Sequence, residues 1–311
     1  MHPAFSVIFF TTASGLGYGL WFWVSLCFLF SPGGPATFAA HLVGLAVGFV
    51  LVTLGLLSST LHLGKPLRAW RAFSQWRTSW LSREGVLALV TYLPLVALVA
   101  LLASGNTRLL LLLPVLLVML GLLSLATVAC TAMIYASLRP IPAWHHSSVL
   151  PAYVGFALLT GGLGGLALLM PHDTPRDVAV LVLLLLAVAM VVLKRRYWRD
   201  IDRGALPATR ASALGLPADR VATVFERPHT EANYLTREMG YVLARKHSAK
   251  LRRLALLLFG AVPVAACAVT LLHPGLAQPA LWVAALSAVL GAFVERWLFF
   301  AEAKHVVMLY Y

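Results

Sequence analysis

The chain has 311 residues, of which 60% are hydrophobic and only 11% are charged, and its formal net charge is +13. Soluble domains need many more charged residues than this to cover their surface. The composition therefore excludes a soluble enzyme of this size, and it leaves room for one soluble segment at most.

The hydrophobic residues form eight blocks, and the sequence predicts an all-α integral membrane protein, a bundle of eight transmembrane helices. Helices are expected because lipid offers no hydrogen-bond partner to an exposed backbone. The sixth block is short and is expected to extend or to enter the bilayer only in part, whereas the other seven are long enough to span it. The predicted spans are 5–30, 38–61, 85–104, 109–134, 149–170, 178–193, 254–272 and 279–301.

The first block is expected to stay in the mature protein as a membrane helix. No Lys or Arg precedes it, and it continues to Phe30, which is too long for the hydrophobic region of a signal peptide.

Small residues gather in two of the blocks. The first contains Ser-Gly-Leu-Gly-Tyr-Gly at 14–19, and the fifth contains Gly-Gly-Leu-Gly-Gly at 161–165. Small side chains let helix backbones approach closely, which is the simpler interpretation. The alternative is a slot for a flat ligand beside exposed backbone.

Lys and Arg are distributed very unevenly between the two predicted sides of the membrane. With eight spans, both termini and the even-numbered loops share one side, which holds all of the 24 basic residues except Arg108 and Arg176. The positive-inside rule places that side in the cytoplasm. We expect a multi-pass protein of the bacterial inner membrane with both termini cytoplasmic.

We interpret residues 1–311 as a single transmembrane domain with a cytoplasmic insert at 194–253, between spans six and seven. The insert contains fourteen Lys and Arg residues. Apolar residues at near-helical spacing in 231–253 predict an amphipathic helix with a basic face. Such a helix would lie on anionic lipid or dock a cytoplasmic partner, and nucleic acid is not expected to bind.

The sequence gives no sign of a metal or haem centre. Cys27, Cys130 and Cys267 each stand alone within an apolar block, and no Cys-x-x-Cys occurs, so an iron–sulfur cluster or structural zinc is not expected. A b-type haem usually needs ligands on facing helices, whereas His41 and His62 lie toward opposite ends of one predicted helix. We therefore expect no metal, no haem and no catalytic residue in this chain.

Several ionisable residues gather at the predicted cytoplasmic edge of the membrane, near tryptophans such as Trp70. Ionisable groups at membrane depth are costly and tend to be functional. A neutral His can donate to a quinone carbonyl or move a proton near pH 7, and a nearby carboxylate can relay protons. The clustered residues are His62, Lys65, Arg68, Glu84, His145, His146, Glu302 and His305.

Three stretches resemble the membrane anchor of dimethyl sulfoxide reductase-type molybdoenzymes. They are His-Pro-Ala-Phe-Ser-Val-Ile-Phe-Phe at 2–10, Leu-His-Leu-Gly-Lys-Pro-Leu-Arg-Ala-Trp at 61–70 and Ser-Arg-Glu at 82–84. The basic insert, with Thr-Arg-Glu-Met-Gly at 236–240, looks most like the branch of this family in cytoplasmic sulfite dehydrogenases. The resemblance spans the whole chain, and His-Leu-Gly-x-Pro-x-Arg-Ala is its most specific motif.

The resemblance implies a three-subunit complex with a molybdopterin catalytic subunit, an iron–sulfur subunit and a haem-free anchor that exchanges electrons with quinone. The functional His of the family maps onto His62, its carboxylate onto Glu84 and its loop Arg onto Arg68. In the exported reductases the catalytic subunits face this loop outside the cytoplasm. Here the charge bias places the loop inside, which favours a cytoplasmic enzyme that oxidises sulfite.

Our leading hypothesis is a quinone-reactive anchor, using ubiquinone or menaquinone, that performs no substrate chemistry alone. One alternative is a secondary transporter, which would show internal repeats and mid-membrane charges that this sequence largely lacks. Another is a purely structural anchor without a quinone site. The candidate quinone-binding residues are His62, Lys65, Arg68 and Glu84, with Trp70, His145, His146 and His305 as secondary candidates.

The uneven distribution of Lys and Arg predicts the side of the membrane on which the C-terminus lies. A reporter that is active only in the cytoplasm, fused after Tyr311, should be active because the last span should end on the positive side. Activity of a periplasm-dependent reporter at the same position would overturn both the topology and the assignment to a cytoplasmic enzyme.

Overall fold

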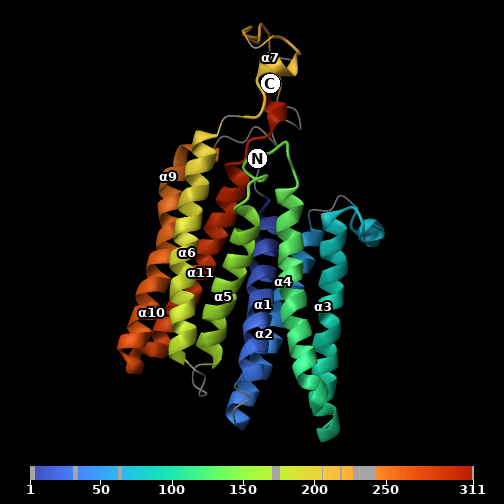
Figure 1. The fold of residues 1–311 in the computed structure, drawn as a ribbon, viewed down its shortest axis with the longest axis vertical. Coiled ribbons are helices and arrows are strands. Elements are labelled where there is room, and N and C mark those ends of the chain that lie inside the picture. Colours follow the sequence, from blue (N-terminus) through green and yellow to red (C-terminus); the bar gives the residue numbers. More distant parts are fainter. Residues whose placement is uncertain are drawn as a thin grey trace.

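The computed structural model describes residues 4–30, 34–61, 65–169, 176–204, 206–217, 219–226, 231 and 243–309. Within these ranges the chain is helical without strands, and eight helices are long and apolar enough to cross a membrane (Figure 1). The predicted fold class is thereby confirmed. The spans are α1 (Phe5–Phe30), α2 (Pro35–Thr60), α3 (Trp80–Ala103), α4 (Leu113–Ala136), α5 (Val149–Leu169), α6 (Arg176–Arg203), α9 with α10 (Leu243–Leu256 and Val262–Leu272) and α11 (Ala277–Ala301).

Shorter helices lie between and beyond these spans. A π-helix, Leu257–Ala261, joins α9 to α10 within one continuous span. Short 3₁₀ segments precede α3 and α4, at Pro66–Gln75 (η1) and Thr107–Leu112 (η2), and the four-residue α7 (Arg210–Ala213) lies beyond the end of the bundle (Figure 1).

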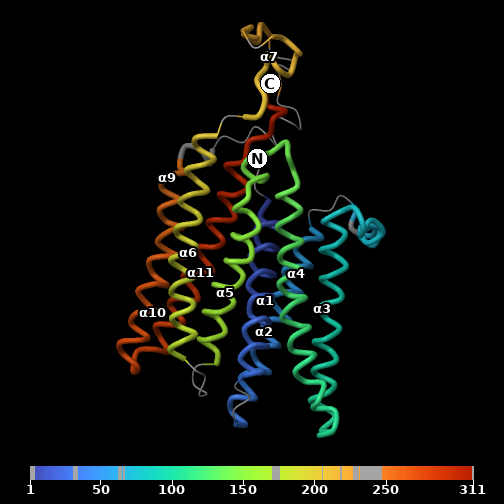
Figure 2. The backbone as a smooth tube through the Cα atoms, viewed as in Figure 1, coloured from blue at the N-terminus to red at the C-terminus, as the bar shows by residue number. Residues whose placement is uncertain are grey.

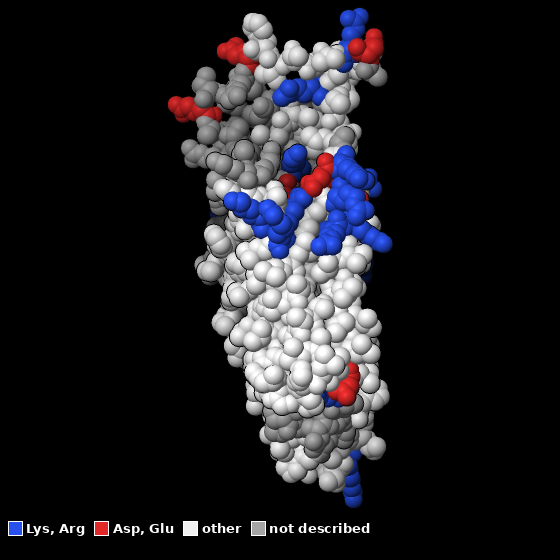
Figure 3. Space-filling model, turned by 90° about the vertical axis from the view of Figure 1, so that its left-hand side faces the viewer, with Lys and Arg blue, Asp and Glu red and all other residues white. Residues whose placement is uncertain are grey.

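Successive spans run in opposite directions, so that α1 begins and α11 ends at the same end of the bundle (Figure 2). Helix α1 is central and packs against α2, α4, α5 and α11. Helices α3 and α4 pair on one side, and α6, α10 and α11 form the other (Figure 1). Lys and Arg gather at the end that carries α7, above a broad uncharged band (Figure 3).

Small residues bring α1 into direct backbone contact with α5. A Cβ added at Gly19 would overlap the carbonyl of Ala157, and one added at Gly161 would overlap the backbone of Gly19. The close-packing interpretation of both small-residue stretches is therefore confirmed. Such packing compensates for the weak hydrophobic drive between helices in lipid.

Two tryptophans on α1 also form hydrogen bonds with the backbones of α2 and α5. The indole nitrogen of Trp21 donates to the carbonyl of Leu45 in α2 at 3.0 Å, and that of Trp23 donates to the carbonyl of Leu158 in α5 at 2.9 Å. The ring of Trp21 fills the space beside Gly48, so any side chain at position 48 would collide with it. A buried indole N–H needs a partner, and these carbonyls supply it.

The sixth span is longer than the predicted range 178–193. Helix α6 has 28 residues and crosses the bundle completely. It continues through the basic residues because Lys194 turns inward while Arg195 and Arg196 remain exposed. A run of charges that marks the end of a hydrophobic block therefore does not end the helix.

The predicted insert at 194–253 accordingly includes the last turns of α6 and the first turns of α9. Residues 232–242, almost half of the predicted amphipathic helix 231–253, lie outside the described residues. Helix α9 begins at Leu243 and leads directly into a membrane span.

The contact between α1 and α5 predicts a position-specific response to a single methyl group. Gly19→Ala should destabilise the protein by about 1–3 kcal/mol, the usual cost of overpacking. Gly15→Ala is the matched control, because a Cβ at Gly15 meets no atom within 4 Å. Thermal unfolding of the detergent-solubilised protein measures both, and equal stability of the two variants would contradict the packing described here.

Candidate functional site

The loop before α3 is fastened to the first turn of that helix. Ser79 caps the helix, and the hydroxyl of Ser82 donates to the carbonyl of Ala72 in η1. The guanidinium of Arg83 donates to the carbonyls of Trp76 and Arg77, at 3.0 and 2.6 Å. Ser82 and Arg83 thus fasten the loop to α3, the helix that carries Glu84.

Three of the predicted site residues lie on the outer side of this loop. Lys65, Arg68 and Trp70 are exposed, Trp70 by 65%. The guanidinium of Arg71 lies 5.6 Å from the ring centroid of Trp70. His62, the central predicted residue, lies outside the described residues. The structure therefore presents cationic and aromatic side chains at the edge of the bundle where α3 begins.

Glu84 faces the opposite way, into the bundle. It is only 6% exposed, and the hydroxyl of Thr131 in α4 donates to its carboxylate oxygen at 2.6 Å. The side chains of the neighbouring residues Arg83 and Glu84 therefore point in opposite directions. The guanidinium contacts the loop, and the carboxyl group contacts the interior of the bundle.

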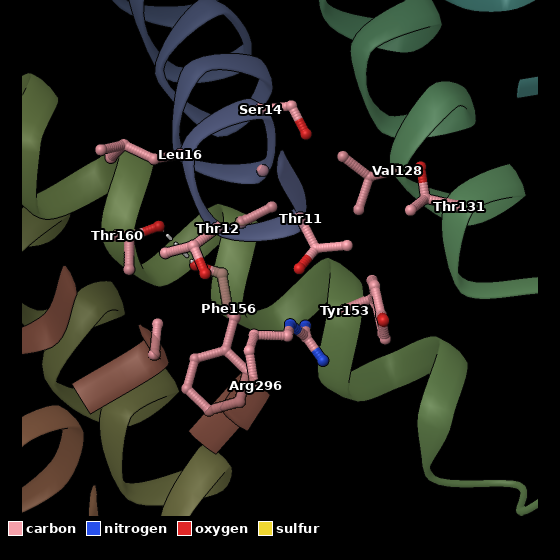
Figure 4. Close-up of a pocket in the computed structure, with 13 residues that line it drawn as sticks. Thr11, Thr12, Ser14, Leu16, Val128, Thr131, Tyr153, Phe156, Thr160 and Arg296 are labelled. Atoms are coloured by element: carbon pink, nitrogen blue, oxygen red, sulfur yellow. Dashed lines mark hydrogen bonds between the residues drawn. The ribbon is translucent and has the colours of Figure 1, made fainter. Parts of the chain in front are cut away.

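Thr131 also lines a small polar cavity between α1, α4, α5 and α11 (Figure 4). Its volume is about 20 Å³, enough for roughly one water molecule. Figure 4 shows Arg296 of α11 extending toward Thr11 and Tyr153, and its guanidinium lies 3.5 Å from the ring centroid of Tyr153. Among the described residues, the buried hydroxyls of Thr12 and Tyr153 have no hydrogen-bond partner. The cavity suits water and is much too small for a quinone ring.

Arg296 belongs to a buried charge cluster, defined here as Lys194, Glu295 and Arg296. The Lys194 ammonium lies 2.5 Å from one carboxylate oxygen of Glu295, and Arg296 lies 3.5 Å from the other. All three side chains are at most 4% exposed. The Lys194 ammonium also lies 3.9 Å from the ring centroid of Tyr197. The cluster ties α6 to α11 within the bundle.

Sequence reasoning placed Lys194 and Arg296 at the basic ends of their spans, and the structure shows in addition that both side chains are buried within the bundle. The available signal was Glu295 beside Arg296 within the apolar run Ala-Phe-Val-Glu-Arg-Trp-Leu-Phe-Phe. A buried cation needs a compensating carboxylate, and adjacent charges of opposite sign in a span satisfy that need. The other basic residues at that end still far outnumber Arg108 and Arg176.

The secondary histidine candidates have partners of their own rather than Glu84. His145 is exposed, and its Nδ1 lies 2.6 Å from the carbonyl of Ala136. In His305 the ring Nδ1 accepts from the backbone N–H of Val307 at 3.0 Å, and burial lowers the pKa of the ring. Neither contact brings a histidine to the α3–α4 interior.

His146 lies in a larger open hollow of about 570 Å³ at the basic end of the bundle. Its Nε2 lies 3.7 Å from Asp200. Burial lowers the pKa of His146, Asp200 acts in the opposite direction, and Lys194 lowers it further. In the same hollow Arg252 contacts both Asp202, at 2.6 Å, and Glu302, at 2.9 Å. Burial raises the pKa of Glu302, and Arg252 opposes that shift.

Comparison with known proteins identifies the family of the chain. The family described as "DMSO reductase anchor subunit (DmsC)" matches residues 1–301. The chain belongs to this family. A relative, one of the subunits of the sulfite dehydrogenase of Allochromatium vinosum, is 33% identical over 343 aligned positions, covering 100% of this chain and 99% of the relative.

The chain is thus the membrane anchor of a dimethyl sulfoxide reductase-type complex and a multi-pass integral membrane protein. As an anchor it holds other subunits of an oxidoreductase complex at the membrane. Thr131, the partner of Glu84, and Arg296, a member of the charge cluster, line the same cavity.

The charge cluster of this anchor predicts a strongly non-additive double-mutant cycle. Glu295→Gln should destabilise the protein by about 3–5 kcal/mol, because it leaves Lys194 and Arg296 without their shared carboxylate in the interior. Adding Lys194→Met should recover part of that loss, because it removes one of the two unpaired cations. Arg196→Met, an exposed neighbour on the same helix, is the control. Thermal unfolding in detergent measures all of these proteins, and additive losses would show that Lys194 and Glu295 do not act as a pair.

Proposed function

We propose that this anchor passes electrons from an iron–sulfur subunit to membrane quinone, in a complex whose molybdopterin subunit oxidises sulfite. Family membership supports the anchoring role, and the relative that belongs to a sulfite dehydrogenase supports the substrate of the partner. The basic end of the bundle, where η1 lies, faces the cytoplasm in this proposal, as the positive-inside rule predicts.

The observation that carries the proposal is the burial of Glu84 directly behind a cationic loop. Ionisable groups at membrane depth are expensive and tend to serve a function. Glu84 has a single hydrogen-bonding side-chain partner among the described residues, Thr131, and none of their cations lies within ion-pair distance of it. A carboxyl group in such surroundings is suited to taking up and releasing a proton.

The residues around η1 fit a quinone headgroup. A bound quinone accepts two electrons and two protons, so its site needs donors, positive charge and a proton relay. Lys65 and Arg68 supply exposed cations, and Trp70 supplies an aromatic surface at the bundle edge. His62 closely precedes them in the sequence and provides a ring that donates or transfers a proton near pH 7. The interior cavity of about 20 Å³ is too small for the ring, so the headgroup binds on the loop side of Glu84.

Each side chain then has a distinct role. His62 donates to a quinone carbonyl, Lys65 and Arg68 stabilise developing negative charge, and Glu84 exchanges protons with His62, directly or through water. A docked iron–sulfur subunit is able to approach the same loop and deliver the electrons there.

The proposal predicts a selective loss of quinone-linked turnover. Glu84→Gln and His62→Ala should each lower it by roughly 10²–10⁴-fold, the usual contribution of a positioned acid–base group. Turnover of the catalytic subunit with an artificial dye should stay at the wild-type rate, because the anchor takes no part in substrate chemistry. Both assays are run on the same purified complex.

Matched controls lie at the other end of the bundle. His273→Ala and Asp177→Asn replace exposed residues of similar chemistry far along the chain from η1 and should leave both activities unchanged. If His62→Ala and Glu84→Gln keep wild-type quinone turnover, the site lies elsewhere. His145, His146 and His305 then become the candidates, or the chain is a purely structural anchor.

A further inference from the structure

A second hollow lies on the outer surface of the bundle, between α6 and the span formed by α9 and α10. Its volume is about 580 Å³. The walls are apolar, with Val188, Val192, Leu257 and Val264 among the lining residues, and two arginines, Arg195 and Arg253, line it as well. An apolar trough with cations in its wall has the chemistry of an amphiphile site.

The π-helix shapes the wall of this hollow. Gly260, within the π-helix, contributes no side chain, and a Cβ at this position would collide with Val191 of α6. Ala261 follows it and is exposed on the hollow. The two spans therefore come close where Gly260 meets Val191, and the hollow lies beside this contact.

Helix geometry places both arginines at headgroup depth. Arg195 follows the first residue of α6, Arg176, by 19 positions, and Arg253 precedes the last residue of α10, Leu272, by 19 positions. At 1.5 Å per residue each separation is about 28 Å, close to the thickness of the hydrocarbon core. Because the two spans are antiparallel, both arginines lie at the same membrane surface. On this side of the molecule, basic side chains gather directly above the broad uncharged band (Figure 3).

The two arginines differ from their neighbours in having no acidic partner within the described part of the chain. Lys194 pairs with Glu295, and Arg252 pairs with Asp202 and Glu302. Among the described residues, neither Arg195 nor Arg253 forms an ion pair, and both are exposed. Arg253 donates to the carbonyl of Ala249 through Nε at 3.3 Å, which leaves its two terminal nitrogens for another acceptor.

We propose that this hollow binds one anionic phospholipid of the surrounding membrane. The phosphate lies between Arg195 and Arg253, whose planar guanidinium groups match phosphate oxygens in bidentate geometry. One acyl chain lies along the apolar wall toward Val264. A quinone or other neutral amphiphile would satisfy the apolar wall but would leave both cations without a counterion. Basic pockets between spans at the cytoplasmic surface bind anionic headgroups for the same reason.

Native mass spectrometry of the intact complex in mild detergent, with lipid extraction, tests the proposal. Dioleoyl phosphatidylglycerol is the titrated probe, and dioleoyl phosphatidylcholine is the neutral comparison. The double variant Arg195→Gln/Arg253→Gln should weaken phosphatidylglycerol binding about 30-fold, if each arginine contributes the usual interaction of a basic residue with an anionic surface. Arg196→Gln/Arg199→Gln removes the same charge from exposed positions on α6 outside the hollow and should bind as the wild type does.

A second variant separates shape from charge. Ala261→Trp narrows the hollow while both arginines remain, and it should also reduce retained phosphatidylglycerol. Equal phosphatidylglycerol binding by the wild type and the arginine double variant would overturn the proposal. So would equal affinity of the wild type for phosphatidylcholine, which would show an apolar groove without headgroup selection. The mass of the intact complex in the same spectra confirms that each preparation is assembled.

Discussion

The direct backbone contact between α1 and α5 is the constraint on which the rest of the bundle depends. Gly19 and Gly161 face each other with no room for a methyl group. This contact holds α1 at the centre, where it also meets α2, α4 and α11. Thr11 and Thr12 reach the cavity beside Thr131 because α1 is held so close. Apolar side chains gain little free energy when they move from lipid into a helix interface. Close packing therefore fixes the positions of the helices here, as a hydrophobic core does for a protein in water.

Buried charge is the second organising feature. Lys194, Glu295 and Arg296 are removed from water between α5, α6 and α11, and desolvation makes each of them costly alone. Together they neutralise much of that cost and fix α6 against α11 at one height. The cluster therefore specifies the register between two spans. It also explains how α6 continues past the residue at which its hydrophobic block ends.

A division between outside and inside occurs at the first turn of α3. Arg83 turns outward to the loop carbonyls, and Glu84 turns inward to Thr131. The loop before α3 is thereby available to a docked partner, while the carboxyl group is in contact with the polar interior. At the far side of the bundle, Arg195 and Arg253 line a hollow on the outer surface.

The sequence by itself determined the number of spans, their order, the basic end and the family, because hydrophobic length, charge and short motifs are local properties of the chain. It also predicted the close packing of the glycine-rich stretches and the position of Glu84 at the start of a span. It did not reveal that Lys194 and Arg296 are buried, and it left open how far the sixth span extends. The reason is that Glu295, the partner that makes the buried cation stable, stands about a hundred positions away from Lys194. Only the tertiary structure could decide which charges face lipid and which face one another, since desolvation depends on neighbours that are distant in sequence.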